Sequence, residues 1–232
     1  MTVLEAHDLH KTYTGGDGGT INVLSGVDLS VGRREIVAIV GASGAGKSTL
    51  LHVLGALDQP TRGYVVVDGH PVNGLSEEEL AALRNRSVGF VFQFHHLLRE
   101  FSAVENVMMP LRIAGKDVPS ARSRAEELLA KVGLSGRMHH RPSELSGGEQ
   151  QRTAVARALA MDPGVVLADE PSGNLDLANA GMLHDLLLEV VDDLEIGMVV
   201  VTHNRSLAAR ANRVLLLEGG RLSDTVVSDV IV

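Results

Sequence analysis

The sequence has 232 residues, 44% hydrophobic and 22% charged, which is enough to form one substantial folded core. Its 21 basic and 29 acidic residues give a net charge of −8, opposite in sign to a nucleic-acid-binding surface, so we expect no nucleic-acid partner. Cysteine is absent, which excludes disulfides, thiolate metal sites and cysteine nucleophiles. Because no apolar run is long enough to span a bilayer and the first residues do not resemble a signal peptide, we expect a soluble cytoplasmic protein.

The first hundred residues contain several patterns that predict turns and a helix start. The glycines between positions 15 and 19 predict a tight loop joining two early strands, and Asp68-Gly69 predicts a hairpin turn. Ser76 and Glu79 have the spacing of a capping box, which predicts a helix running to Arg86. An antiparallel fringe beside a larger sheet is therefore expected.

Short β-branched runs predict buried strands, several of them followed by helical patterns, as in a parallel sheet covered on both faces. These runs cover 36–40, 88–92, 165–168, 198–202 and 214–217. Between Phe94 and Met161 the strand signal disappears and Pro119 and Gly133 bracket a helix, which predicts a mostly helical insertion. The turn signal at 218–220 predicts a last hairpin. The fold class is α/β.

The segment 41–49, which reads GASGAGKST, fits the phosphate-binding P-loop pattern between the strand 36–40 and a helical run over 49–57. Glycines let successive N–H groups turn toward an anion, and the helix adds the positive end of its dipole. A lysine can then reach the β- and γ-phosphates while a serine hydroxyl binds Mg²⁺. The predicted nucleotide-binding residues are Gly41, Ser43, Gly44, Ala45, Gly46, Lys47, Ser48 and Thr49.

Polar residues follow three more of the predicted strands. Asp169 is placed to hold the Mg²⁺ shell, and Glu170 to polarise an attacking water, although an acidic pair at a strand end can also simply face solvent. Gln93 offers an amide oxygen as a further Mg²⁺ ligand. His203 by itself is more often an ordinary surface or core residue, and it enters as a candidate because of its surroundings.

The string Leu145 to Arg152, LSGGEQQR, indicates which kind of P-loop protein this is. Ser146 and Glu149 form a capping box that opens a helix toward Ala160, leaving a second anion site at its free N–H groups. The whole string resembles the signature of the ATP-binding cassette (ABC) ATPases, and it stands in that family's order between Gln93 and Asp169.

This resemblance extends over nearly the whole chain, from Tyr13 through the motif 172–176 to His203. It implies ATP and Mg²⁺ as cofactors, adenine stacking on Tyr13, nucleotide contact by Asp176, and a γ-phosphate contact by His203. It also implies a nucleotide-driven homodimer in which Ser146, Gly147 and Gly148 of one copy close over the phosphate held by Lys47 of the other. We expect one ABC ATPase domain over 1–232, with an N-terminal antiparallel β subdomain, a core over about 1–93 and 164–232, and a helical subdomain over about 94–163.

Within the family, the segments 92–98, 105–107, 140–144 and 168–176 are most similar to the ATPase subunits of lipoprotein-releasing transporters. Macrolide-type exporter ATPases and FtsE-type regulatory couplers are the alternatives. The resemblance implies integral membrane permease partners and a peripheral position on the cytoplasmic face of the inner membrane. Apolar residues beyond Gln93 are either core or a docking surface for such a partner: Phe94, Leu97, Leu98, Phe101, Val107, Met108 and Met109.

Overall fold

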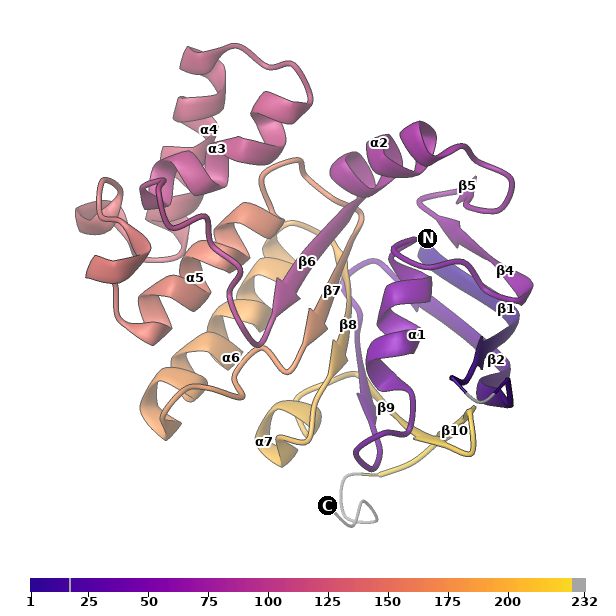
Figure 1. The fold of residues 1–232 in the computed structure, drawn as a ribbon. Helices are drawn as coiled ribbons and strands as arrows, with labels where there is room; N and C mark the ends of the chain where they lie inside the picture. Colours follow the sequence, from indigo (N-terminus) through magenta and orange to yellow (C-terminus); the bar gives the residue numbers. More distant parts are fainter. Residues whose placement is uncertain (17, 227–232) are drawn as a thin grey trace.

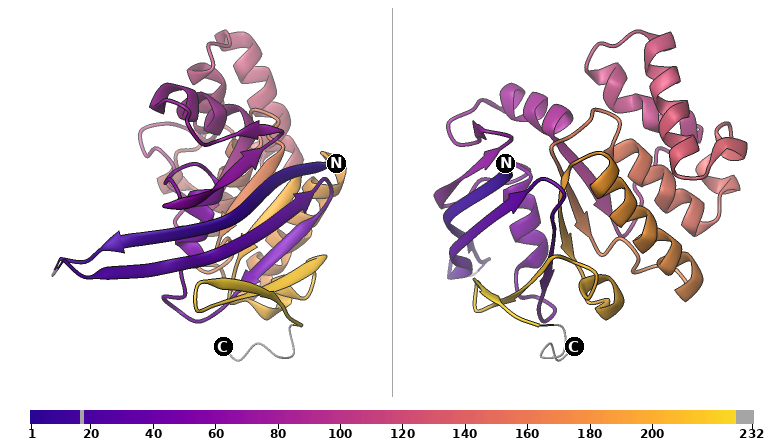
Figure 2. Two further views of the ribbon diagram at one scale, coloured as in Figure 1. Left: turned by 90° about the vertical axis from the view of Figure 1, so that its right-hand side faces the viewer. Right: turned by 180° about the vertical axis from the view of Figure 1, so that it is seen from behind.

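The computed structural model describes residues 1–16 and 18–226, whose strands form two sheets (Figure 1). The smaller sheet is antiparallel, in the order β2-β1-β4-β5. Its strands are β1 (Thr2–Thr14), β2 (Thr20–Gly32), β4 (Arg62–Val67) and β5 (His70–Pro71). The long β1–β2 hairpin extends beyond the rest of the molecule (Figure 2).

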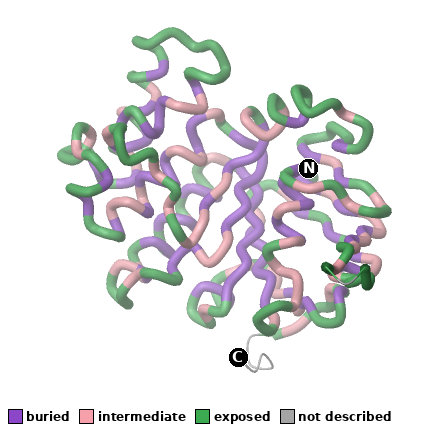
Figure 3. Tube along the Cα trace, in the orientation of Figure 1, coloured by how far each residue is buried: buried purple, intermediate pink, exposed green. Residues whose placement is uncertain are grey.

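The larger sheet has the order β10-β9-β3-β8-β7-β6 and is parallel except for the final hairpin. Its strands are β3 (Ile36–Val40), β6 (Val88–Phe92), β7 (Val165–Asp169), β8 (Gly197–Val201), β9 (Arg213–Glu218) and β10 (Arg221–Asp224). The α/β prediction is confirmed, and each predicted strand is present with ends that differ by at most one residue. β3 and β8 are buried throughout, because helices or the second sheet cover both of their faces (Figure 3).

Seven α-helices surround the sheets in the described residues. They are α1 (Lys47–Leu54), α2 (Glu77–Ser87), α3 (Ala103–Ile113), α4 (Val118–Lys131), α5 (Gly147–Ala158), α6 (Leu177–Asp193) and α7 (Arg205–Ala208), with short 3₁₀ turns at Ser135–Arg137 and Pro142–Glu144. The capping boxes predicted for α2 and α5 are formed. The helix predicted over 49–57 begins two residues earlier and ends at Leu54.

Successive side chains of β3 point to opposite faces of the larger sheet, and each face belongs to its own hydrophobic core. Val37 and Ile39 face α1 and the antiparallel sheet, whereas Ile36, Ala38 and Val40 face the core that contains residues of α3 to α7. Every regular element between β6 and β7 is helical, and α3 and α4 project from one end of the molecule (Figure 1). None of the helices within the described ranges is long and apolar enough to cross a membrane.

Candidate functional site

The loop between β3 and α1 presents open backbone N–H groups. Gly46 is the N-cap of α1, and no side chain caps this end of the helix, so the first-turn amides are available to an anion. The φ of Gly46 is +99°, and a Cβ there would lie 2.7 Å from Val23 Cγ1. At Gly41 a Cβ would lie 2.5 Å from the carbonyl oxygen of Leu217. The loop therefore needs glycine at both positions.

Lys47 folds back over this loop. Its Nζ donates to the carbonyl oxygens of Gly41, at 2.8 Å, and Ala42, at 2.9 Å. These two contacts hold the ammonium group at the mouth of the loop, among the residues that line the cavity described next. A positive charge held beside free amide donors is suited to a phosphate chain.

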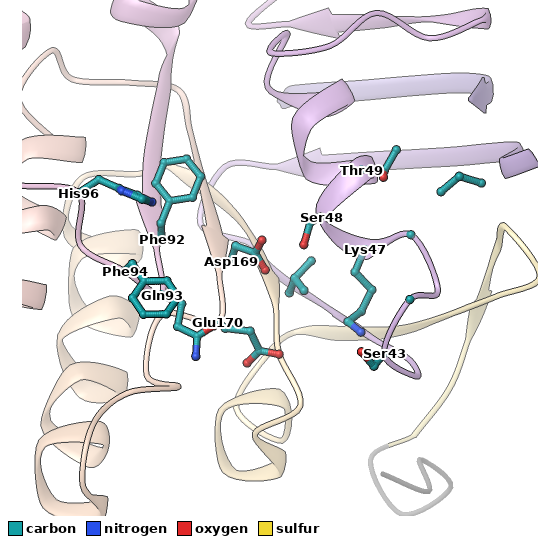
Figure 4. A pocket seen from close by; sticks show the side chains of 14 residues that line it. Ser43, Lys47, Ser48, Thr49, Phe92, Gln93, Phe94, His96, Asp169 and Glu170 are labelled. Carbon is teal, nitrogen blue, oxygen red and sulfur yellow. The ribbon is translucent and has the colours of Figure 1, made fainter. Parts of the chain in front are cut away.

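A cavity of about 520 Å³ opens against the loop. Figure 4 shows Ser43, Lys47, Ser48 and Thr49 on one side of it, Gln93, Phe94 and His96 on the other, and Asp169 and Glu170 between them. The remaining lining residues are Val23, Gly44, Gly46, Phe92 and Val201. The structure thus brings together most of the P-loop candidates with Gln93, Asp169 and Glu170, from the carboxyl ends of β3, β6 and β7.

Glu170, which lines the cavity, is hydrogen-bonded to His203. Glu170 Oε1 accepts from His203 Nδ1 at 2.8 Å and from the His203 backbone N–H at 3.0 Å. The Thr202 hydroxyl donates to Oε2 at 3.2 Å. These three contacts hold the carboxylate in one place. The backbone of Glu170 has a φ of +45°, a left-handed conformation that is costly for a non-glycine residue.

Gln93 is bonded across the cavity wall to the turn that follows β7. Its Nε2 donates to Asn174 Oδ1 at 3.0 Å, and Asn174 Nδ2 returns a bond to the Gln93 carbonyl at 3.1 Å. This bond fixes the orientation of the amide group, whose oxygen, Oε1, is the atom that can ligate a cation. Asp169, the last residue of β7, lines the same cavity.

Ser146, Gly147, Gly148 and Asp176 lie apart from the cavity lining in the part of the chain that the structure describes. Ser146 caps α5, and Glu149 completes the box; the bonds from Ser146 and then Arg137 lower the pKa of Glu149 to about 2. Asp176 caps α6 by accepting from the Asn179 backbone N–H at 2.9 Å. A Cβ at Gly148 would lie 2.6 Å from Asn179 Oδ1, so the two helix starts are packed together.

Tyr13, Gly41, Ala45 and His203 are also absent from the lining among the described residues, although Gly41 and Ala45 belong to the loop and His203 is bonded to Glu170. Tyr13, near the end of β1, is 40% exposed. Its hydroxyl donates to Asp58 Oδ2 at 2.8 Å and also interacts with the side chain of Thr49, which lines the cavity.

The sequence does not predict Val23, Phe92, His96 and Val201 as cavity residues, and it predicts Phe94 only as a core or docking residue.

The neighbouring histidines 95 and 96 have different surroundings. His96 lines the cavity, whereas His95 Nδ1 bonds the buried Gln151, and burial lowers the pKa of His95. Within the described residues, no group of three or more His, Cys, Asp or Glu side chains is placed to hold a metal ion.

Comparison with known proteins agrees with this geometry. The family model described as ABC transporter matches residues 24–173. The lipoprotein-releasing system ATP-binding protein LolD of Xanthomonas campestris pv. campestris (strain 8004) is 57% identical over 228 residues, covering 98% of this chain and 95% of that protein. LolD of Bordetella pertussis (strain Tohama I) is 56% identical over 219 residues, 94% of each chain.

Solved structures of ABC cassettes have the same fold. The dimeric structure of MJ0796, a bacterial ABC transporter cassette, has a TM-score of 0.86 and 38% identity, over 95% of this chain and 96% of that one. A dimeric post-hydrolysis state of MJ0796 bound to ADP and Pi has the same TM-score at 37% identity, with the same coverage. On its matched motifs, its fold and its full-length relatives, this chain belongs to the ABC transporter family and is an ATPase domain of that family.

Proposed function

We propose that this chain is the ATP-hydrolysing subunit of a transporter that extracts lipoproteins from the inner membrane for delivery to the outer membrane. The observation that carries the proposal is the P-loop cavity, which Glu170 lines, in a chain that is 57% identical to a LolD protein over almost its full length. Its partners would be permease subunits resembling LolC and LolE, and its position would be peripheral, on the cytoplasmic face of the inner membrane.

The P-loop side of the cavity fits the phosphate chain of a nucleoside triphosphate. The uncapped start of α1 supplies backbone donors, and Lys47 holds its charge beside them. We assign phosphate contacts to the loop residues Gly41 to Thr49 and the stacking of the adenine ring to Tyr13, whose ring is partly exposed beside Thr49.

The oxygen donors around the same cavity fit Mg²⁺. The Ser48 hydroxyl, Gln93 Oε1 and the Asp169 carboxylate are hard ligands, and the lining contains few carboxylates, as expected for an ion that keeps waters and binds substrate phosphates. When bound, Mg²⁺ would neutralise charge on the phosphates. Ser48 and Gln93 would hold it, and Asp169 would act directly or through water.

Glu170 is the group we assign to orient and deprotonate the attacking water. Its carboxylate faces the cavity and is held by Thr202 and His203, so its position is set before any substrate binds. The His203 ring is held by the bond of its Nδ1 to Glu170 at 2.8 Å, which leaves Nε2 as the ring nitrogen available to a γ-phosphate oxygen.

A second copy would complete the site. Ser146, Gly147 and Gly148 present the first turn of α5 away from the described cavity, so within one chain they are not positioned to contact its nucleotide. We propose a head-to-tail homodimer, driven by nucleotide, in which this helix start and Asp176 of one copy approach the phosphate held by Lys47 of the other.

A second cavity, of about 400 Å³ and lined mostly by apolar side chains, offers a docking surface for the permease. Its wall includes Phe90, Phe92, Pro110 and Ile113, and Ile113 is 70% exposed. Of the docking candidates beyond Gln93, Phe94, Leu98 and Phe101 are exposed, Leu97 and Met109 are half-buried, and Val107 and Met108 are buried. The first three would extend the docking surface, and the last two are core.

The test is purification from membranes in mild detergent followed by reconstitution. We expect the tagged chain to retain permease subunits and to support ATP-dependent release of a lipoprotein from proteoliposomes. We expect Ile113→Ser, in the wall of the second cavity but not in the lining of the P-loop cavity, to reduce retention. Retention of a membrane partner without any lipoprotein release would favour an FtsE-type coupler and contradict the proposal. Specific ATPase activity should also fall on dilution, because the site needs two copies.

A further inference from the structure

A buried lysine lies next to Tyr13 and outside the cavity. Lys11, two residues earlier on the same face of β1, is buried, and its Nζ donates to Asp58 Oδ1 at 2.6 Å and to the Gln59 carbonyl at 2.7 Å. A buried lysine is costly unless its charge is paired, and even a buried ion pair adds little to stability. The pair beside Tyr13 therefore calls for a functional reason.

Asp58 joins that ion pair to the tyrosine. One carboxylate oxygen accepts from Lys11 and the other accepts from the Tyr13 hydroxyl at 2.8 Å. Lys11 Nζ also lies 4.9 Å from the centroid of the Tyr13 ring, within the range of a cation–π contact. The ring is thereby fixed at its hydroxyl by Asp58 and at its face by Lys11.

The same contacts tie Tyr13 to the helix of the P-loop. Asp58 follows α1, and its backbone N–H donates to the carbonyl of His52 in that helix at 3.2 Å. Burial opposes ionisation of Asp58, but the bonds from Lys11 and Tyr13 outweigh it and lower the pKa of this carboxyl. Burial and the bond to Asp58 raise the pKa of Tyr13, so the hydroxyl remains a donor.

We infer that Lys11 and Asp58 are positioning residues that hold the Tyr13 ring in register with the P-loop, and that they contribute to affinity for the nucleoside part of the nucleotide but not for its phosphates. The inference rests on the proposed function of Tyr13. A side chain with two rotatable bonds and 40% exposure could otherwise take several rotamers, and fixing it beforehand removes part of the entropy cost of stacking.

The test compares two probes, Mg-ATP and inorganic tripolyphosphate with Mg²⁺, by titration calorimetry on the purified full chain. We expect Asp58→Asn to weaken ATP binding by roughly fivefold, the loss of one charge-assisted bond, and to leave tripolyphosphate binding within about twofold. Asp193→Asn is the matched control, because it breaks another Lys–Asp pair of 2.6 Å, to Lys131, far from Tyr13 in the sequence; it should change neither affinity.

Two further variants separate positioning from folding. Tyr13→Phe keeps the ring but removes its bond to Asp58, so it should reproduce the ATP-selective loss even if Asp58→Asn does not fold. In a Tyr13→Ala background, Asp58→Asn should cause no additional loss, because the ring it positions is gone.

Each contrary result has its own meaning. Equal weakening of both probes by Asp58→Asn would overturn the inference, since the pair would then act through the P-loop. Loss of ATP affinity in Tyr13→Ala with no loss in Asp58→Asn or Tyr13→Phe would overturn it too, while leaving Tyr13 as the stacking residue. Unchanged ATP affinity in Tyr13→Ala would remove the proposed role of Tyr13 itself, and the inference with it.

Discussion

Glu170→Gln is the variant that most directly tests the assigned chemistry. Glutamine keeps the shape of the side chain and an oxygen that can accept from the His203 backbone N–H, which lies 3.0 Å from Oε1. Its NH₂ group replaces Oε2, which accepts from the Thr202 hydroxyl at 3.2 Å and from the His203 backbone N–H at 3.3 Å. The hydroxyl can rotate and accept instead of donating, whereas the contact of the backbone N–H with Oε2 is lost. We therefore expect a stability cost of about 1 kcal/mol, the size of one weakened hydrogen bond, and an intact fold.

The loss in turnover should be much larger than that cost. Glutamine cannot take a proton from water, and a positioned general base contributes about 10²–10⁴ in rate, which corresponds to about 2.7–5.4 kcal/mol of barrier. The proposed nucleotide contacts are those of the P-loop and do not include Glu170, so ATP affinity should stay within a few-fold and the ATP-bound dimer should accumulate.

Phosphate release, ATP titration calorimetry and size-exclusion chromatography with ATP measure these three quantities. Glu195→Gln is a matched control: Glu195 also has a left-handed φ, of +53°, and an ion pair, with Arg34 at 2.5 Å, but it does not line the cavity. Turnover of Glu170→Gln within tenfold of the parent would refute the assignment of Glu170.

Four other changes have expected outcomes. Gly46→Ala places a methyl group 2.7 Å from Val23 Cγ1 at a left-handed φ, so we expect a loss of about 1–3 kcal/mol of stability and of measurable ATP binding, checked by urea unfolding and calorimetry. Ser146→Ala should cost about 1 kcal/mol of stability at pH 7. Glu149 has its pKa lowered to about 2, so its contribution is full above about pH 4.5 and disappears as pH falls toward 2; the stability gap between Glu149→Gln and the parent should therefore narrow between pH 7 and pH 3.5 in urea titrations. Ser48→Ala should raise the Mg²⁺ concentration needed for half-maximal phosphate release, with EDTA abolishing it in both proteins.

The strands and capped helices were predictable because their signals are local. A β-branched run such as Ile36–Val40 can only be stable when both faces are covered, and Ser-x-x-Glu satisfies orphan N–H groups wherever it precedes a helix. The same signal was present and overlooked at Ser102 and Glu105, which cap α3. The P-loop was predictable for the same reason, since its anion site is built from consecutive residues.

The contacts that tune the site were not predictable, because they join residues far apart in the sequence. The Gln93–Asn174 pair spans 81 positions and the Lys11–Asp58 pair spans 47. Neither residue type indicates its partner, and an amide or an ion pair forms only after the sheet has placed both ends. The left-handed backbone of Glu170 is likewise set by its bond to Val201 across the sheet and not by its own preference.

The position of Gln93 links the chemistry to the proposed docking surface. The β6 strand ends at Phe92, so Gln93 is directed into the cavity while the next residue, Phe94, is 66% exposed. The bonds to Asn174 hold Gln93 against the turn after β7 and prevent it from moving independently of that turn. A cation that drew Gln93 Oε1 toward the phosphates would therefore have to move the Asn174 side chain as well, or break the bond between Gln93 Nε2 and Asn174 Oδ1. Because Asn174 Nδ2 also binds the Gln93 backbone carbonyl, a shift of Asn174 that keeps both bonds would move the Gln93 backbone and, with it, the neighbouring Phe94.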